Sequence, residues 1–201
     1  MAQMNVIARG AEATIYLVDD PIIGAQVIKK VRHPKSYRHP KLDEQIRRQR
    51  TKHEAKLLHH AKAAGLRVPF IYEIDLDECS ITMEYIRGKR LRDVIDADLE
   101  YRLGRCIGML HKAGLVHGDL TTSNMLLCDD IAFIDFSLGD VTEELEAKGV
   151  DLRVLAENVK AIHVRLDFGP VIRGYKEVHD IPIEEQMEKI EQRGRYLRRG
   201  G

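Results

Sequence analysis

The spacing of hydrophobic and polar residues predicts strands in the first part of the chain. Residues 14–18 and 25–31 are rich in β-branched and other apolar side chains, and the turn-forming run Asp19-Asp20-Pro21 follows the first of them. Residues 71–76 and 80–86 have the same character and are joined by Asp77 and Glu78. Short apolar runs separated by turn residues are typical of neighbouring strands.

A long helix is predicted between the second and third of these strands. It runs from about Leu42 to Ala64 and ends at Gly65, with an apolar stripe formed by Leu42, Ile46, Leu57 and Ala61. Glu54 falls on the same stripe. A carboxylate on an inward-facing side of a helix is costly unless it is paired, so we expect a cationic partner for Glu54.

The pattern becomes helical after residues 87–89. Residues 91–95 and 99–112 repeat with helical spacing, and the second helix is expected to end at Gly114. Strands with one helix, a short connection and then mostly helices predict an α+β fold of two lobes. We expect the β-rich lobe over residues 1–86 and the helical lobe over residues 87–201.

Composition favours a packed globular protein. The 201 residues are 44% hydrophobic and 32% charged, with a formal net charge of zero. This composition argues against a largely disordered chain. No apolar run approaches the ~20 residues of a membrane span, and the first residues do not resemble a secretory signal. The cysteines are three and widely spaced, which favours a reducing, cytoplasmic environment.

Basic residues are concentrated in two stretches. Residues 29–62, from Lys29 to Lys62, hold twelve Lys or Arg and three Asp or Glu, and the tail from Arg193 to Arg199 is also basic. Such runs are usually solvated surface. Two of them in a neutral protein leave room for a polyanion such as tRNA, although a frayed end is an equal alternative for the tail.

A polar segment next to two short apolar strands has the character of a metal site. Residues 117–124 precede the strand 125–128, and Asp135 follows the strand 131–134. If Asp129 and Asp130 form a two-residue hairpin loop, Asn124 lies opposite Asp135, and Asp119 reaches the same place. Oxygen ligands of this kind suit Mg²⁺. The alternative is that these residues only cap or turn the chain.

The same residues resemble the active-site segments of protein-kinase-like folds. His117-Gly118-Asp119-Leu120, followed by Asn124, is similar to the catalytic loop, and Asp135-Phe136-Ser137 is similar to the metal-binding triplet. The resemblance implies that Asp119 orients or deprotonates the attacking hydroxyl. It also implies that Asn124 and Asp135 hold Mg²⁺ on the phosphates of ATP.

A narrower resemblance covers nearly the whole chain. Several motifs occur in this order along the chain: Arg9-Gly10-Ala11-Glu12-Ala13, Lys30-Val31-Arg32, Lys35-Ser36-Tyr37-Arg38-His39-Pro40, Arg50-Thr51 with Glu54-Ala55, and the loop from His117 to Asn124 with its Thr121-Thr122-Ser123 extension. Together they resemble the small atypical kinases of the KEOPS complex, which are relatives of the RIO kinases. The resemblance implies a minimal bilobal kinase-like fold with a small N-lobe and a reduced helical C-lobe.

The resemblance also assigns the remaining site residues and the activity. Lys30 would bind the ATP phosphates, with Glu54 as its ion-pair partner, and the adenine and phosphate contacts would come from Gly10, Ala11, Glu12, Ala13, Met83, Glu84 and Ile86. Lys30 fits the family's spacing without a gap, whereas Lys29 does not. The implied function is an autophosphorylating Ser/Thr kinase and ATPase that supports threonylcarbamoyl-adenosine formation in tRNA. Its implied partners are the threonylcarbamoyltransferase and other KEOPS subunits.

Departures from the wider kinase pattern limit this interpretation. Gly118 replaces an Arg that reads activation-loop phosphorylation in many protein kinases, Ser137 replaces a Gly and could restrict motion of its segment, and no Ala-Pro-Glu follows. Asp151 either braces the catalytic loop from a following helix or starts that helix. His117 is interpreted as a structural hydrogen-bonding residue, and His53, His59 and His60 as surface residues.

Two other functions stay open. One is a small-molecule kinase of the aminoglycoside or choline type, which shares the catalytic loop, although such enzymes usually have a larger helical lobe. The other is a catalytically silent scaffold or tRNA-binding module. The presence of Lys30, Glu54, Asp119, Asn124 and Asp135 together argues for the enzyme.

Overall fold

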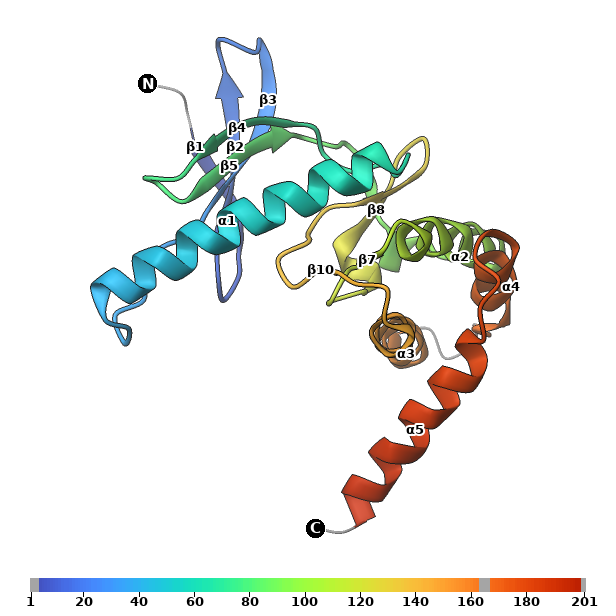
Figure 1. Cartoon of the computed structure of the whole chain (residues 1–201). Helices are drawn as coiled ribbons and strands as arrows, with labels where there is room; N and C mark the ends of the chain where they lie inside the picture. The colour runs from blue at the N-terminus through green and yellow to red at the C-terminus, as the bar shows by residue number, and fades with distance from the viewer. Residues whose placement is uncertain (1–3, 163–166, 200–201) are drawn as a thin grey trace. The chain divides into compact units, whose positions relative to one another are not determined.

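The computed structural model describes residues 4–162 and 167–199, with side chains up to residue 193 in the last helix (Figure 1). The chain divides into two compact units. The first holds the chain up to His60 together with Val68–Arg87, and the second holds Ala61–Arg67 and the chain from Gly88 onward. This division differs from the expected one in giving the turn after the long helix to the second unit.

The first unit is an antiparallel sheet of five strands with one long helix. The strand order is β1-β2-β3-β5-β4, with every pair antiparallel. The strands are β1 (Met4–Arg9), β2 (Thr14–Asp20), β3 (Ala25–Val31), β4 (Ile71–Asp75) and β5 (Ser80–Glu84). The β-branched runs of the sequence therefore form the strands predicted from them, and β3 is placed in the sheet between β2 and β5.

The helix α1 (Pro40–Ala63) lies close to its predicted bounds. Leu57 and Ala61 are buried as predicted, but Leu42 is 53% exposed, so the first part of the predicted apolar stripe is wrong. Polar contacts hold that part of the helix instead, through buried Asp43, which pairs with Arg47 at 2.7 Å.

Gly65 ends the helix as the sequence predicts. Its φ is +86°, and the Gly65 and Leu66 amides donate to the Lys62 and Ala61 carbonyls. This is the hydrogen-bond pattern of a Schellman cap, in which glycine tolerates the positive φ.

The second unit contains the remaining helices and three short strand pairings. Its elements are β6 (Lys89–Arg90), η1 (Leu91–Asp93), α2 (Ala97–Lys112), β7 (Leu115–Val116), η2 (Thr122–Asn124), β8 (Met125–Leu127), β9 (Ile131–Phe133), β10 (Asp140–Val141), α3 (Leu145–Ile162), α4 (Gly169–Val178) and α5 (Ile183–Arg199). The helix predicted over 91–95 is only a single 3₁₀ turn. In the described chain, no helix is both long and apolar enough to cross a membrane.

Two glycines bring α2 and α4 into close contact. A Cβ at Gly104 would overlap the Val171 carbonyl, and a Cβ at Gly174 would overlap the Tyr101 carbonyl. A larger residue at either position would force the two backbones apart. This close approach places α4 against the helix that leads into the loop at His117.

The β8–β9 hairpin has a different register from the predicted one. Met125 pairs with Phe133 and Leu127 with Ile131, so the loop is the three residues 128–130 rather than Asp129-Asp130 alone. Asn124 consequently lies opposite Ile134, whose amide donates to the Asn124 carbonyl at 3.1 Å. A two-residue loop of the common type needs positive φ at both positions, and neither aspartate has it.

Candidate active site

The first unit contains a buried ion-pair centre on β3 and α1. Lys30 is 4% exposed, and its Nζ lies 2.6 Å from Glu54 Oε1. Lys29, one residue earlier, pairs with the exposed Glu78 instead. Successive residues of a strand face opposite sides, so only one of the two lysines is buried. The cationic partner expected for Glu54 is confirmed.

Arg32 completes this centre and was not predicted as part of it. Its Nη2 donates to Glu54 Oε2 at 2.6 Å, and the side chain is 1% exposed. One carboxylate is therefore shared by two buried cations. The signal in the sequence was the spacing: Arg32 is two residues after Lys30 and falls on the same side of the chain.

The turn between β1 and β2 is tied to the helical side of the first unit. Gly10 N donates to the Ala13 carbonyl at 2.9 Å. Lys35 Nζ donates to the Ala11 carbonyl, and Glu12 pairs with Arg50 on α1. The phosphate-covering role of residues 10–13 stays a prediction.

The segment predicted to bind adenine lies at the end of β5. Met83 and Ile86 are buried, and the Glu84 amide donates to the Phe70 carbonyl at 2.8 Å. The Glu84 amide is thus used within the first unit. The adenine contacts of Met83, Glu84 and Ile86 stay a prediction.

In the second unit, Asp151 holds the loop that follows β7. The amides of His117 and Gly118 both donate to its carboxylate, at 2.5 and 2.8 Å. Asp151 lies in the interior of α3 and is 2% exposed. The helix-start alternative is therefore wrong, and the bracing alternative is confirmed.

Gly118 has a backbone conformation that explains its presence. Its φ is +76°, and a Cβ there would overlap the Leu138 carbonyl. Glycine adopts positive φ without steric cost, so the absence of an Arg at this position follows from the backbone. Ser137 does not have positive φ; its amide donates to Asp135 Oδ1 at 2.9 Å.

His117 is enclosed among rings and carboxylates. It is fully buried, with its ring centroid 4.8 Å from that of Phe136. Burial lowers the pKa of His117, and the charges of Asp151, Asp135 and Asp119 oppose this shift. Its Nδ1 accepts a hydrogen bond from the Asp119 amide at 3.4 Å, which fits the structural hydrogen-bonding role expected of it, whereas its Nε2 has no hydrogen-bond partner within the described residues.

Asn124 fixes the position of the exposed Asp119. Its Nδ2 donates to the Asp119 carbonyl at 3.0 Å and to Asp119 Oδ2 at 2.8 Å. With both amide protons directed at Asp119, the Oδ1 of Asn124 is the ligand atom that it can offer. An amide oxygen here and the carboxylate of Asp135 are the donor types that Mg²⁺ takes.

This arrangement is not the one predicted from the hairpin. Asn124 is fixed to Asp119 rather than placed directly across from Asp135. Within the described residues, no group of three or more His, Cys, Asp and Glu is arranged as a metal site. The assignment of Mg²⁺ to Asn124 and Asp135 stays a prediction that the chemistry of the donor set fits.

A buried chain of polar groups continues from Asp151 to α4. His111 Nε2 lies 3.4 Å from Asp151 Oδ2, and His111 Nδ1 lies 3.1 Å from the Tyr175 hydroxyl. The carboxylate can only accept, so the Nε2 of a neutral His111 donates to it and Tyr175 donates to Nδ1. Sequence reasoning missed both residues, because no local pattern links positions 64 residues apart.

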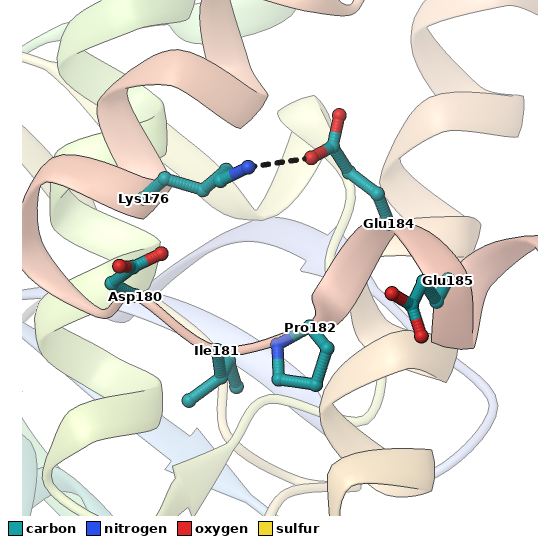
Figure 2. Close-up of a pocket in the computed structure, with 6 residues that line it drawn as sticks. All are labelled: Lys176, Asp180, Ile181, Pro182, Glu184 and Glu185. Carbon is teal, nitrogen blue, oxygen red and sulfur yellow. Dashed lines mark hydrogen bonds and ion pairs between the residues drawn. The ribbon is translucent and has the colours of Figure 1, made fainter.

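A cavity on the second unit lies away from this site. It has a volume of about 340 Å³ and is lined by residues of α4, α5 and the turn between them, where Lys176 pairs with Glu184 at 2.8 Å (Figure 2). None of the predicted site residues lines it.

Comparison with known families gives a match to the RIO domain over residues 25–160. The chain belongs to the RIO domain family. The match covers β3 and α1 with the ion-pair centre, and the loop at His117 with most of α3. Helices α4 and α5 lie beyond it.

Relatives of this RIO-domain chain extend over its full length. It is 42% identical to the KEOPS complex subunit Bud32 of Pyrococcus abyssi, with 98% of each chain covered. It is also 42% identical to a probable bifunctional tRNA threonylcarbamoyladenosine biosynthesis protein of Methanothermobacter thermautotrophicus, with 96% of this chain covered. The chain spans about a third of that relative, 36% of its length.

Solved structures show the same fold. The Rio2 kinase of Chaetomium thermophilum, in a complex with ADP, Mg²⁺ and phosphoaspartate, superposes with a TM-score of 0.71 at 18% identity, covering 96% of this chain and 66% of that one. The predicted α+β kinase-like fold and the predicted family are confirmed.

Proposed function

We propose that this RIO-domain chain is a Mg²⁺- and ATP-dependent atypical Ser/Thr protein kinase and ATPase. We further propose that it works as a KEOPS subunit in threonylcarbamoyl-adenosine modification of tRNA. The observation that carries the proposal is the structure of the loop from His117 to Asn124. The side-chain amide of Asn124 holds the exposed carboxylate of Asp119, and the buried carboxylate of Asp151 holds the backbone amides just before it.

The second unit would supply the groups that act on the acceptor. Asp119 is exposed, and Asn124 orients its Oδ2, so the carboxylate is ready to orient a hydroxyl or accept its proton. Asn124 Oδ1 and Asp135 would hold Mg²⁺. The ion, when bound, would neutralise charge on the phosphate oxygens.

The first unit would supply the groups that bind ATP. Lys30 is a cation fixed by Glu54, which suits it to bind phosphate oxygens without reorganisation. The turn of residues 10–13 would cover the phosphates, and the backbone at Met83, Glu84 and Ile86 would bind adenine.

The names of the relatives support the assignment to tRNA modification. The alignment with a Bud32 subunit covers 98% of both chains, and several bifunctional relatives carry threonylcarbamoyladenosine biosynthesis in their names. The proposed partners are the threonylcarbamoyltransferase and other KEOPS subunits in the cytoplasm. tRNA would contact residues 29–62 and the tail 193–199; α5 extends to Arg199, and the tail side chains beyond Arg193 lie outside the described residues.

ATP turnover tests the proposal. Wild type, Asp135→Ala and Asp119→Asn are assayed with Mg²⁺ alone, with tRNA and with the partner subunit, while free phosphate and phosphoprotein are both followed. We expect turnover in wild type that falls at least 100-fold in both variants and changes with partner or tRNA. Turnover stimulated by an aminoglycoside or choline instead would indicate a small-molecule kinase. No nucleotide binding in any mixture would leave a scaffold.

A further inference from the structure

A cavity lined by cationic residues lies in the first unit, beside the ion-pair centre. Its volume is about 110 Å³, roughly that of three or four water molecules. Its lining is formed by the β1–β2 turn, the segment after β3 and the first half of α1, and it includes Arg32, Lys35, Tyr37, Arg38, Arg47 and Arg50. Lys30, the cation assigned to ATP, does not line it. The space suits one phosphate group rather than a whole nucleotide.

The charges around the cavity do not cancel. Five lining residues are Arg or Lys, and Lys30 adds a sixth cation through its pair with Glu54. Three carboxylates face these six cations, namely Glu12, Asp43 and Glu54. The cluster therefore has a net charge of +3 in which each carboxylate is already shared or paired. Such an excess in a concave site favours an anion.

Arg38 is the cation at the cavity with the most unused hydrogen-bonding capacity. Within the described chain, its guanidinium makes a 3.5 Å ion pair with Asp43, longer than a hydrogen bond, and a stacking contact 5.3 Å from the Tyr37 ring centroid. A guanidinium has five N–H donors in a planar fork that matches phosphate oxygens. Arg38 can thus bind a phosphate without breaking a hydrogen bond.

Tyr37 adds an aromatic surface next to this cation. The side chain is 75% exposed, and the Arg38 guanidinium stacks over its ring. Proteins that bind single-stranded nucleic acids often present an exposed aromatic ring beside a cation. The cation binds the phosphate, and the base stacks on the ring. A phosphorylated side chain of a protein would use the cations but not the ring.

We propose that this cavity and the exposed Tyr37 ring beside it bind one nucleotide of single-stranded RNA, with the phosphate in the cavity among Lys35, Arg38 and Arg50 and the base stacked on Tyr37 outside it. The inference rests on the proposed function, because it gives the tRNA contact of the first basic stretch a defined site. RNA binding at this cavity does not require that the chain hydrolyses ATP.

Binding of a fluorescent single-stranded RNA oligonucleotide to the full chain tests this proposal. Tyr37→Ala is expected to weaken binding about tenfold, from the loss of one stacked base, whereas Tyr37→Phe keeps wild-type affinity. Arg38→Gln is expected to weaken binding and to lower the slope of log affinity against log salt by about 0.7, from the loss of one phosphate contact. Lys160→Gln is the control, because Lys160 is exposed on α3, lies outside both basic stretches and has no ion pair within the described chain.

An abasic oligonucleotide separates the two contacts. Tyr37→Ala should not change its affinity, whereas Arg38→Gln should weaken it as before. Equal losses in Tyr37→Ala and Lys160→Gln, or no RNA binding by wild type, would overturn the proposal. So would tight binding of a phosphoserine peptide in place of RNA.

Two further measurements keep this proposal distinct from the proposed function. Saturating Mg-ATP should leave RNA affinity unchanged; displacement of the RNA would mean that the cavity belongs to the ATP site and would overturn the inference. ATP hydrolysis by wild type is measured in parallel. RNA binding without ATP hydrolysis would support the RNA-binding site and contradict the proposed enzyme activity. ATP hydrolysis without RNA binding would support the enzyme activity and contradict the RNA-binding site. Melting temperatures confirm that each variant is folded.

Discussion

Each unit of the molecule is organised around a buried carboxylate, and the two are satisfied in different ways. Glu54 in the first unit is neutralised by the side chains of Lys30 and Arg32. Asp151 in the second unit accepts from the backbone amides of His117 and Gly118 and from His111. The first arrangement balances charge between side chains, and the second uses one charge to fix the course of a loop.

This difference indicates whether loss of each carboxylate mainly lowers stability or mainly disturbs the geometry of the site. Loss of Glu54 leaves two buried cations without their counter-charge, so the main cost is to stability. Loss of Asp151 leaves backbone amides unsatisfied next to the proposed catalytic Asp119, so the main cost is to geometry.

Glu54→Gln should have the largest effect on stability. Removing one partner of a buried ion pair typically costs about 3–5 kcal/mol, and here two cations lose it. The matched control is Glu78→Gln, which removes the partner of Lys29 at the surface and should cost less than about 1 kcal/mol. Urea unfolding of both variants measures this. Equal losses would mean that the buried centre is no different from a surface pair.

Asp151→Ala should lower ATP turnover more strongly than its loss of stability alone would explain. The amides of His117 and Gly118 lose their acceptor, which costs about 2–3 kcal/mol, and the loop carrying Asp119 is no longer held. Displacement of a catalytic group by about 1 Å can lower a rate about 100-fold. ATP turnover and unfolding are measured on the same preparations. A variant that unfolds earlier but turns over ATP at the wild-type rate when folded would refute the positioning role.

Glu100 is a buried carboxylate of another kind, which extends the comparison. It lies on α2 and is fully buried, and neither of its oxygens has a hydrogen-bond partner within the described residues. Burial raises the pKa of Glu100 from 4.5 to about 7, and the charges of Asp167 and Asp96 add to the shift.

Stability should therefore depend on pH through Glu100. The folded state keeps the proton after the unfolded chain has lost it, so the free energy of unfolding falls as the pH rises from about 4.5 to about 7. Glu100→Gln should be more stable than wild type above pH 7, by at most about 3 kcal/mol, and equal to it near pH 4. Chemical unfolding across this range measures the difference, with the exposed Asp98→Asn as control. A constant difference at all pH values would contradict the assignment.

Tyr175→Phe should have the smallest effect. It removes the hydroxyl that donates to His111 Nδ1 and leaves that buried nitrogen unsatisfied, which costs about 1–2 kcal/mol. His111 keeps its contact with Asp151, so ATP turnover should fall only severalfold, in kcat rather than in KM. A loss as large as that of Asp151→Ala would mean that α4 and not α3 holds the loop.

Local pattern predicted much of the first unit. The strands, the helix that ends at Gly65 and the need of Glu54 for a cation all follow from spacing and from the cost of burying charge. The hairpin register and the exposed Leu42 were wrong for local reasons, namely the φ values at Asp129 and Asp130 and the polar contacts that hold the start of α1.

The sequence by itself determined the fold class, the family and the identity of the residues that resemble a phosphotransfer site. Only the tertiary structure decided that Asp151 holds the loop, that Gly118 has positive φ, that Arg32 shares Glu54, and that His111 and Tyr175 extend the network into α4. The physical reason is that hydrophobic periodicity reports which residues are buried. A hydrogen bond from backbone to a distant carboxylate leaves no periodic trace, because every residue but proline has the same amide.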